Sequence, residues 1–261
     1  MLSLSDIVNV KVGIGRGVFE APGVTVIGGQ QSFSQLIKKL FANGEQGFYY
    51  DPNDLSTMYQ DAAGTVPVTG AGQPVGLIRD KSGRNNHAYQ TTSASRPILR
   101  KNAVTGANYL EFDGSDDFLQ TAVSLPFPVT AVAPFDFKSG ANIKCVLSAG
   151  ATGYLRSTAT TASVYSYPDR GTVAKKKADV LLHELTGDSV NIRSNSAAVA
   201  MSDTDNKNPY LAQNKYICSF SDTHTTLRAA MDLYGMVVIR KVLSTSEEAE
   251  LRAHFNKRMG I

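Results

Sequence analysis

Short apolar runs separated by turn residues fill most of the sequence from residue 47 onward, and they restrict the chain to few architectures. Gly, Pro, Asn, Asp and Ser interrupt these runs, and each of these residues favours a turn. A parallel α/β sheet would need helical periodicity between the strands, and the sequence has none there. The pattern therefore predicts an all-β domain, a sandwich or a barrel, over residues 46–261.

The expected strands follow the apolar runs in chain order. They are Gly47–Tyr50, Val75–Arg79, Ala88–Thr91, Tyr109–Asp113, Phe118–Thr121, Val129–Phe135, Ile143–Ser148, Leu155–Ser157, Ser163–Tyr167, Val180–Leu185, Val190–Arg193, Ala197–Met201, Tyr216–Ser219 and Leu233–Ile239.

The first 45 residues differ from this texture. Residues 1–32 are rich in glycine and predict either short strands or an arm that becomes ordered only on a partner. In the segment 33–45, the side chains Leu36, Ile37, Leu40 and Phe41 share one helical stripe, which predicts an amphipathic helix from about residue 34 to 42. We predict that these four residues dock the arm and helix on a partner.

The C-terminal stretch LSTSEEAELRAHFNKRMGI predicts a second helix. Ser244 and Glu247 have the spacing of a capping box, in which two backbone donors at the helix start are satisfied reciprocally. Leu251 and Phe255 lie one turn apart and should pack on the sheet, and Gly260 should end the helix.

The decapeptide LEFDGSDDFL, residues 110–119, holds four carboxylates: Glu111, Asp113, Asp116 and Asp117. Sandwich glycanases that retain configuration use a Glu-x-Asp-x-Glu strand, because two carboxylates must lie about 5 Å apart. Positions 111, 113 and 115 here read Glu, Asp and Ser, and Gly114 interrupts the strand. We therefore interpret the decapeptide as a turn, predict no catalytic residue, and keep a glycan hydrolase as the less favoured alternative.

A second polar loop, LIRDKSGRNNHAYQ, offers oxygen ligands of the kind that calcium prefers. Asp80, Ser82 and Asn85 are the candidates, and a rigid Asx turn is the alternative for the same residues. The spacing does not match an EF-hand, so we predict no resident metal and leave calcium as the cation to test. His87 is expected to anchor the turn.

Composition limits the partners. The formal net charge is +3, and Lys175–Lys177 is the only compact basic run, so nucleic acid is not an expected partner. No apolar stretch is long enough to cross a bilayer, and the N-terminus does not read as an ordinary signal peptide, so we expect a soluble protein made in a cytoplasm.

The two cysteines, Cys145 and Cys218, are expected to be small buried hydrophobes, and a single disulfide between them is the alternative.

The chain has no tryptophan, which disfavours a lectin, because sugar rings commonly stack on large aromatic side chains. Tyr154, Tyr165 and Tyr167 are the candidates for that stacking if a sugar is bound.

The run LFANGEQGFYYDPNDLSTMYQDAAGTVPVTGAGQPVGLIRDKSGRNNHAYQTTSASRPIL, with YLEFDGSDDFL after it, resembles a segment of tailed-bacteriophage virion proteins that carry a concanavalin A-like, or laminin-G-like, jelly roll. The C-terminal LYGMVVIRKVLSTSEEAELRAHFNKRMGI is similar to the closing strand and helix of that group. The resemblance spans roughly residues 40–122 and 232–261, and it implies a two-sheet antiparallel jelly-roll sandwich with a short N-terminal and a C-terminal helix.

The resemblance also implies a function. We expect a non-enzymatic virion structural protein, a decoration, tail or baseplate component, that is synthesised in the host bacterial cytoplasm. Its partners would be other virion proteins and further copies of itself, since closed homo-oligomers are common. The alternative is a carbohydrate-binding module that attaches to a host-surface glycan.

Overall fold

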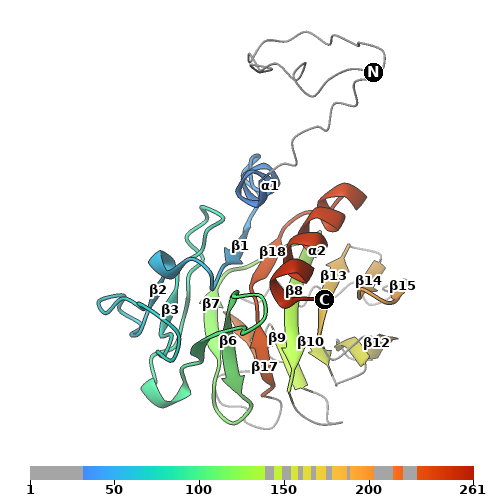
Figure 1. The fold of residues 1–261 in the computed structure, drawn as a ribbon. Coiled ribbons are helices and arrows are strands. Elements are labelled where there is room, and N and C mark those ends of the chain that lie inside the picture. The colour runs from blue at the N-terminus through green and yellow to red at the C-terminus, as the bar shows by residue number, and fades with distance from the viewer. Residues whose placement is uncertain are drawn as a thin grey trace, which may run out of the picture. The chain divides into compact units, whose positions relative to one another are not determined.

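The structure is a computed structural model, and it describes residues 32–138, 144–148, 154–157, 161–165, 169–174, 178–186, 189–202, 214–219 and 228–261. Residues 1–31 of the predicted arm, 1–32, and the predicted sugar-stacking Tyr167 lie outside the described residues. Two antiparallel sheets and two helices make up the domain (Figure 1). The predicted all-β sandwich is confirmed.

The first sheet, called sheet A, runs in the order β15-β14-β13-β8-β17-β6-β5, and β18 pairs with both β8 and β1. Its strands are β15 (Ala198–Ser202), β14 (Ser189–Arg193), β13 (Ala178–Leu185), β8 (Val129–Phe137), β17 (Ala230–Leu233), β6 (Asn108–Asp113), β5 (Ile98–Lys101), β18 (Met236–Ile239) and β1 (Gly47–Tyr50).

The second sheet, sheet B, runs in the order β12-β11-β10-β9-β16-β7-β4-β3-β2. Its strands are β12 (Asp169–Ala174), β11 (Thr161–Tyr165), β10 (Tyr154–Ser157), β9 (Lys144–Ser148), β16 (Asn214–Ile217), β7 (Leu119–Ala122), β4 (Ala88–Tyr89), β3 (Leu77–Ile78) and β2 (Met58–Tyr59). The 3₁₀ turns Leu55–Thr57 and Ser93–Ser95 lie in the connections before and between these strands.

The predicted continuous strand Leu233–Ile239 is wrong, because the structure divides it in two. Gly235 has a φ of +148°, which side-chain-bearing residues rarely adopt, and a Cβ there would lie 3.1 Å from the Tyr50 carbonyl oxygen. The break lets β17 pair with β6 while β18 pairs with β1, so sheet A forks along the long strand β8.

The main core lies between the two sheets and contains fully buried side chains such as Phe48, Phe112 and Phe135. Alternation along a strand places every second residue in this core. On β8, Ala131, Ala133 and Phe135 belong to it, whereas Val132 faces a second cluster on the other side of sheet A. Strand β8 is therefore buried on both faces.

The second core lies between sheet A and the helices α1 (Phe33–Leu40) and α2 (Thr245–Met259) (Figure 1). The predicted C-terminal helix is confirmed: Ser244 and Glu247 form the capping box, and Gly260 is left-handed at its end. Leu251 and Phe255 are fully buried in this core. In the part of the chain that the structure describes, no helix is long and apolar enough to span a membrane.

The four residues predicted to dock a partner occupy a different environment. Leu36, Ile37, Leu40 and Phe41 are at most 5% exposed and pack in the second core, with α2 and sheet A. The helix is also two residues shorter at its C-terminal end than predicted. These side chains therefore contact this chain's own core, and the apolar face of α1 is not available for a partner.

Candidate functional site

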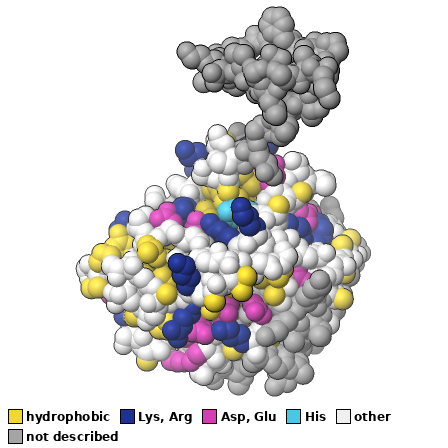
Figure 2. Space-filling model, viewed as in Figure 1, with side chains coloured by type: hydrophobic (Ala, Val, Ile, Leu, Met, Phe, Trp, Pro, Cys, Tyr) yellow, Lys and Arg dark blue, Asp and Glu magenta, His cyan; other side chains and the backbone are white. Residues whose placement is uncertain are grey.

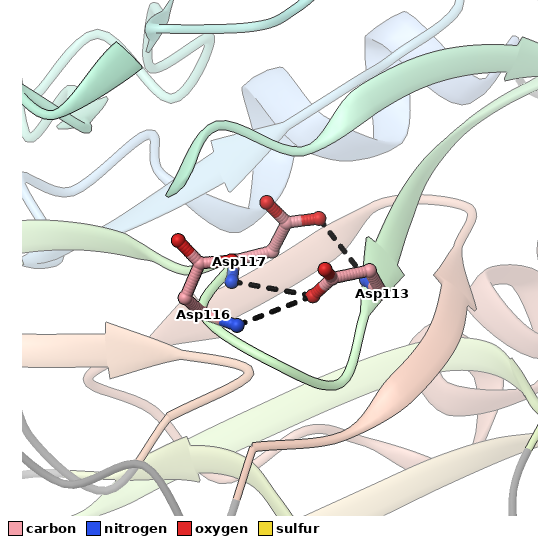
Figure 3. Close-up of side chains that lie close together, drawn as sticks. All are labelled: Asp113, Asp116 and Asp117. Carbon is pink, nitrogen blue, oxygen red and sulfur yellow. Dashed lines mark hydrogen bonds between the residues drawn. The ribbon is translucent and has the colours of Figure 1, made fainter. Parts of the chain in front are cut away.

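The acidic turn joins the two sheets, because β6 belongs to sheet A and β7 to sheet B. One oxygen of Asp113 accepts backbone N–H groups from Asp116 (3.3 Å) and Asp117 (3.4 Å), and an Asp117 oxygen accepts the Asp113 N–H (3.0 Å) (Figure 3). Gly114 has a φ of +80°, and a Cβ there would lie 2.8 Å from the Ala230 nitrogen. The turn thus requires glycine and is built by its own carboxylates.

Neighbouring side chains tie the turn to the 3₁₀ turn Ser93–Ser95 and to the segment before β17. Asp116 accepts a hydrogen bond from Ser95 Oγ at 2.8 Å. The Arg228 guanidinium donates to the Asp116 carbonyl oxygen and lies 4.5 Å from the centre of the Phe118 ring. These contacts hold the turn against segments that lie 21 and 112 residues away in the sequence.

The three aspartates of the turn concentrate negative charge. Each of Asp113, Asp116 and Asp117 offers an oxygen within 4.8 Å of the others. Burial of Asp117, together with the charges of the other two, raises its pKa to about 7, although the hydrogen bond from the Asp113 backbone and the charge of Arg228 oppose the shift. Every one of these carboxylates already accepts a hydrogen bond, so the cluster acts as turn chemistry and supports no cation assignment.

The predicted loop site at Asp80, Ser82 and Asn85 is an Asx turn. The Asp80 carboxylate accepts the backbone N–H of Ser82 (2.8 Å), its hydroxyl (2.8 Å), the Asn86 N–H (3.1 Å) and an N–H of β1 (2.9 Å). Asn85 is left-handed, and His87 Nδ1 accepts the Asp80 N–H (3.0 Å), so the anchoring function predicted for the histidine is confirmed. Because both carboxylate oxygens accept protein donors, these residues do not fit a calcium ion.

Next to the acidic turn, a pocket of about 520 Å³ opens over the ends of β5 and β6. It is lined by Pro74, Ser93, Ala94, Arg96, Ile98, Arg100, Glu111, Phe112, Asp113, Asp117, Lys138 and Ala230. The β5–β6 pocket, as we call it, mixes cationic and anionic side chains.

In the β5–β6 pocket, Glu111 is the carboxylate that two cationic side chains contact. It accepts from Arg100 Nε at 2.6 Å and from Lys138 Nζ at 2.8 Å, and Lys138 also contacts Asp232 at 2.9 Å. The Glu111 side chain is 27% exposed, so it lies partly open to solvent beside these two cations. Strand register explains the arrangement, because Asp232 on β17 lies directly opposite Glu111 on β6.

These contacts decide what the carboxylates can do chemically. The hydrogen bond from Lys138, with that from Arg100, lowers the pKa of Glu111 despite partial burial. A general acid needs the opposite shift. Asp113, the other carboxylate at the Glu-x-Asp spacing, accepts the backbone hydrogen bonds of the turn. The pocket instead offers fixed donors and acceptors, the chemistry that a hydroxylated ligand requires.

The predicted stacking tyrosines lie elsewhere. Tyr154 on β10 and Tyr165 on β11 are paired in register on sheet B, away from the β5–β6 pocket. The sequence reasoning missed another tyrosine, Tyr109 on β6. Its ring lies 5.1 Å from that of Tyr234, which is buried between β17 and β18, and Lys138 Nζ lies 5.8 Å from the Tyr109 ring centre. The spacing in the sequence could have identified it, because Tyr109 precedes Glu111 by two residues and therefore shares its face of β6.

Cys218 is a buried thiol outside any disulfide, and its sulfur donates to the Ala229 carbonyl at 2.8 Å. This agrees with the expectation of a small buried hydrophobe.

No family model and no curated protein matches the sequence. Among solved structures, the chain is similar to the ligand-binding domain of botulinum neurotoxin serotype D in complex with N-acetylneuraminic acid (TM-score 0.52, 7% identity, 68% of this chain and 48% of that chain). It is also similar to a mutant Trypanosoma rangeli sialidase displaying trans-sialidase activity (TM-score 0.55, 11% identity, 84% and 34%). A third is the binding domain of Paraclostridial Mosquitocidal Protein 1 (TM-score 0.51, 8% identity, 69% and 49%).

The chain spans about half or less of the length of each of these proteins. At such low identity, the likeness establishes the fold alone, a two-sheet β-sandwich.

Proposed function

We propose that this β-sandwich is a non-catalytic glycan-binding domain and that the β5–β6 pocket is its binding site. The observation that carries the proposal is the convergence of Arg100, Glu111 and Lys138 in an open pocket beside the Tyr109 ring. Support comes from the solved structures, because one similar domain was determined in complex with N-acetylneuraminic acid.

The pocket's chemistry suits sugar hydroxyls, each of which both donates and accepts hydrogen bonds. Glu111 accepts, whereas Arg100 and Lys138 donate, and all three are held by one another before a ligand arrives. Arg100 and Lys138 are 46% and 36% exposed, so their charged ends remain within reach of a ligand. The volume of about 520 Å³ lies within the usual range for small-ligand sites.

An acidic sugar is the first class to test. Its carboxylate would compete with Glu111 for Arg100 and Lys138, since both are cationic donors. The hydroxyl groups of the sugar would then donate hydrogen bonds to Glu111.

A glycan array that includes sialylated, uronic-acid-containing and neutral glycans tests the proposal, with calcium and with chelator. We expect Arg100→Ala and Glu111→Gln to lose most of the binding of the full chain. Arg240→Ala, which removes an exposed arginine outside the pocket, is the matched control and should bind normally. Absence of binding to every glycan, or equal binding by all variants, would overturn the proposal.

A virion structural component is the second candidate, and the resemblance of residues 40–122 and 232–261 to tailed-bacteriophage virion proteins favours it. The two candidates are compatible, because a virion protein can carry a glycan-binding domain. Deletion of residues 1–31 tests this candidate: it leaves Ser32 as the α1 cap, so the domain should stay folded while losing incorporation into particles. A folded truncated chain that still joins particles would contradict docking by the N-terminal region.

A further inference from the structure

A second pocket, of about 330 Å³, lies between α1, α2 and β1. Aromatic rings form one wall: Phe33 stacks flat on His254, with ring centres 3.3 Å apart and planes at 4°, and meets Tyr49 edge-on at 5.7 Å. Figure 2 shows a histidine, cationic side chains and hydrophobic surface together on the face below α1. We call this the α1–α2 pocket.

The opposite wall of the α1–α2 pocket is charged. Asp51 accepts from Arg258 Nη1 at 2.7 Å and from Lys81 Nζ at 3.1 Å, so this carboxylate is neutralised by two cations. Lys38, which is exposed, also lines the pocket. Cationic side chains therefore outnumber the carboxylate in the lining, and an anion is favoured over a cation as occupant.

Two buried polar atoms of the pocket lining lack partners within the described structure. Tyr49 is 2% exposed, and its hydroxyl lies beside the Asp51 carboxylate and the Arg258 guanidinium without meeting hydrogen-bond geometry with either. The His254 Nε2 atom is likewise buried and without a partner. Burying such groups is unfavourable unless something binds them, so both atoms point to a ligand.

We propose that the α1–α2 pocket binds a small carboxylate carried on a six-membered ring. The ring lies against the aromatic wall of Phe33, Tyr49 and His254, and the carboxylate accepts a hydrogen bond from the Tyr49 hydroxyl and faces Lys38. The volume holds one ring-sized ligand. A sugar acid and an aromatic acid share this chemistry, and the experiment separates them. This site is distinct from the β5–β6 pocket, so it does not depend on the proposed function.

Calorimetric titration of the full chain with sodium benzoate and with sodium glucuronate, each to roughly 20 mM, tests the proposal. We expect at least one acid to saturate the protein, and whichever binds identifies the ring. Tyr49→Phe should weaken binding about fivefold or more, because it removes only the donor. It should not lower the melting temperature of the unliganded protein, because no hydrogen bond is lost.

Tyr234→Phe is the matched control. The Tyr234 hydroxyl accepts from Asn102 Nδ2 at 2.9 Å and lies outside the pocket, so this variant should lose stability and keep its affinity. Lys38→Ala, at an exposed position, should weaken binding about twofold without a change in stability. Saturation by neither acid, equal affinity in Tyr49→Phe, or loss of binding in Arg100→Ala, which would place the acid in the other pocket, would overturn the proposal.

Discussion

Among the carboxylates of the acidic turn, Asp117 is the one whose protonation is coupled to folding. Its pKa is about 7 in the folded protein, because it is buried beside Asp113 and Asp116, and about 4 in an unfolded chain. Between these values the folded protein holds a proton that the unfolded chain has released. The free energy of unfolding therefore falls as the pH rises from about 4 to about 7 and then levels off.

Asp117→Asn tests this coupling. The amide oxygen can still accept the Asp113 N–H, and no charge is buried, so the variant should be more stable than the parent by about 1–2 kcal/mol at pH 8. Near pH 4.5 the difference should largely vanish. Urea denaturation at both pH values measures it, with Glu250→Gln on α2 as a control. A difference that is independent of pH would contradict the prediction.

Gly114 is the residue of the turn at which a side chain would be least tolerated. Gly114→Ala combines a positive φ with a Cβ placed 2.8 Å from the Ala230 nitrogen, so we expect a loss of about 2–3 kcal/mol. Gly72→Ala is the control, because Gly72 has a φ of +92° and nothing within 4 Å of its added Cβ. It should lose about 1 kcal/mol. Equal losses in thermal denaturation would show that the close approach to β17 is unimportant.

At the scale of elements, α1 differs most from its prediction, because the helix expected to dock a partner packs in the core of this chain. Its apolar face completes the second core, and its first turn is capped by Ser32 with Gln35 in a capping box. The exposed face carries Lys38 and Lys39 near the helix C-terminus, where cations interact favourably with the helix dipole. α1 is therefore a structural helix of the domain.

The substitution Leu40→Ala tests whether the apolar face of α1 stabilises the domain. Leu40 is fully buried in the second core, so its truncation should cost about 2–5 kcal/mol in the isolated protein. Lys39→Ala, on the exposed face of the same helix, should change stability by less than about 0.5 kcal/mol. If denaturation showed Leu40→Ala to be as stable as the parent, the side chain would be available to a partner after all.

At the scale of the whole molecule, sheet A is the shared wall of two cores. One face packs on sheet B and the other on the two helices, which explains why β8 is apolar almost throughout. The helices cover only part of the outer face. The β5–β6 pocket lies outside their contacts, and the α1–α2 pocket lies where the two helices meet sheet A.

Calcium provides a test of the whole domain. The Asp80 carboxylate accepts four hydrogen bonds from the protein, and the acidic turn uses its carboxylates to shape itself. We therefore expect the same melting temperature, within about 1 °C, in millimolar calcium and in chelator. A clear rise with calcium would show that one of these loops is a binding site.

Local rules explain what the sequence determined by itself. The ends of α2 depend on Ser244, Glu247 and Gly260, whose interactions span a few residues. The hydrogen bonds that shape the turn at Asp80 are made with Ser82, Asn86 and His87, all within seven residues, and the N–H of β1 adds one from farther away. Alternation likewise identified most strands, and turn residues between them indicated a sandwich or barrel. Such features can be predicted because the interacting groups are adjacent in the chain.

Only the tertiary structure decided which strands share a sheet and which charges meet. The turn between β6 and β7 reads like a hairpin, yet its strands belong to different sheets. Lys138 reaches Glu111 across 27 residues, and Arg258 reaches Asp51 across 207. The burial of α1 likewise depends on α2, at the other end of the chain. These contacts form because apolar faces from distant segments are removed from water together, and no local pattern encodes that pairing.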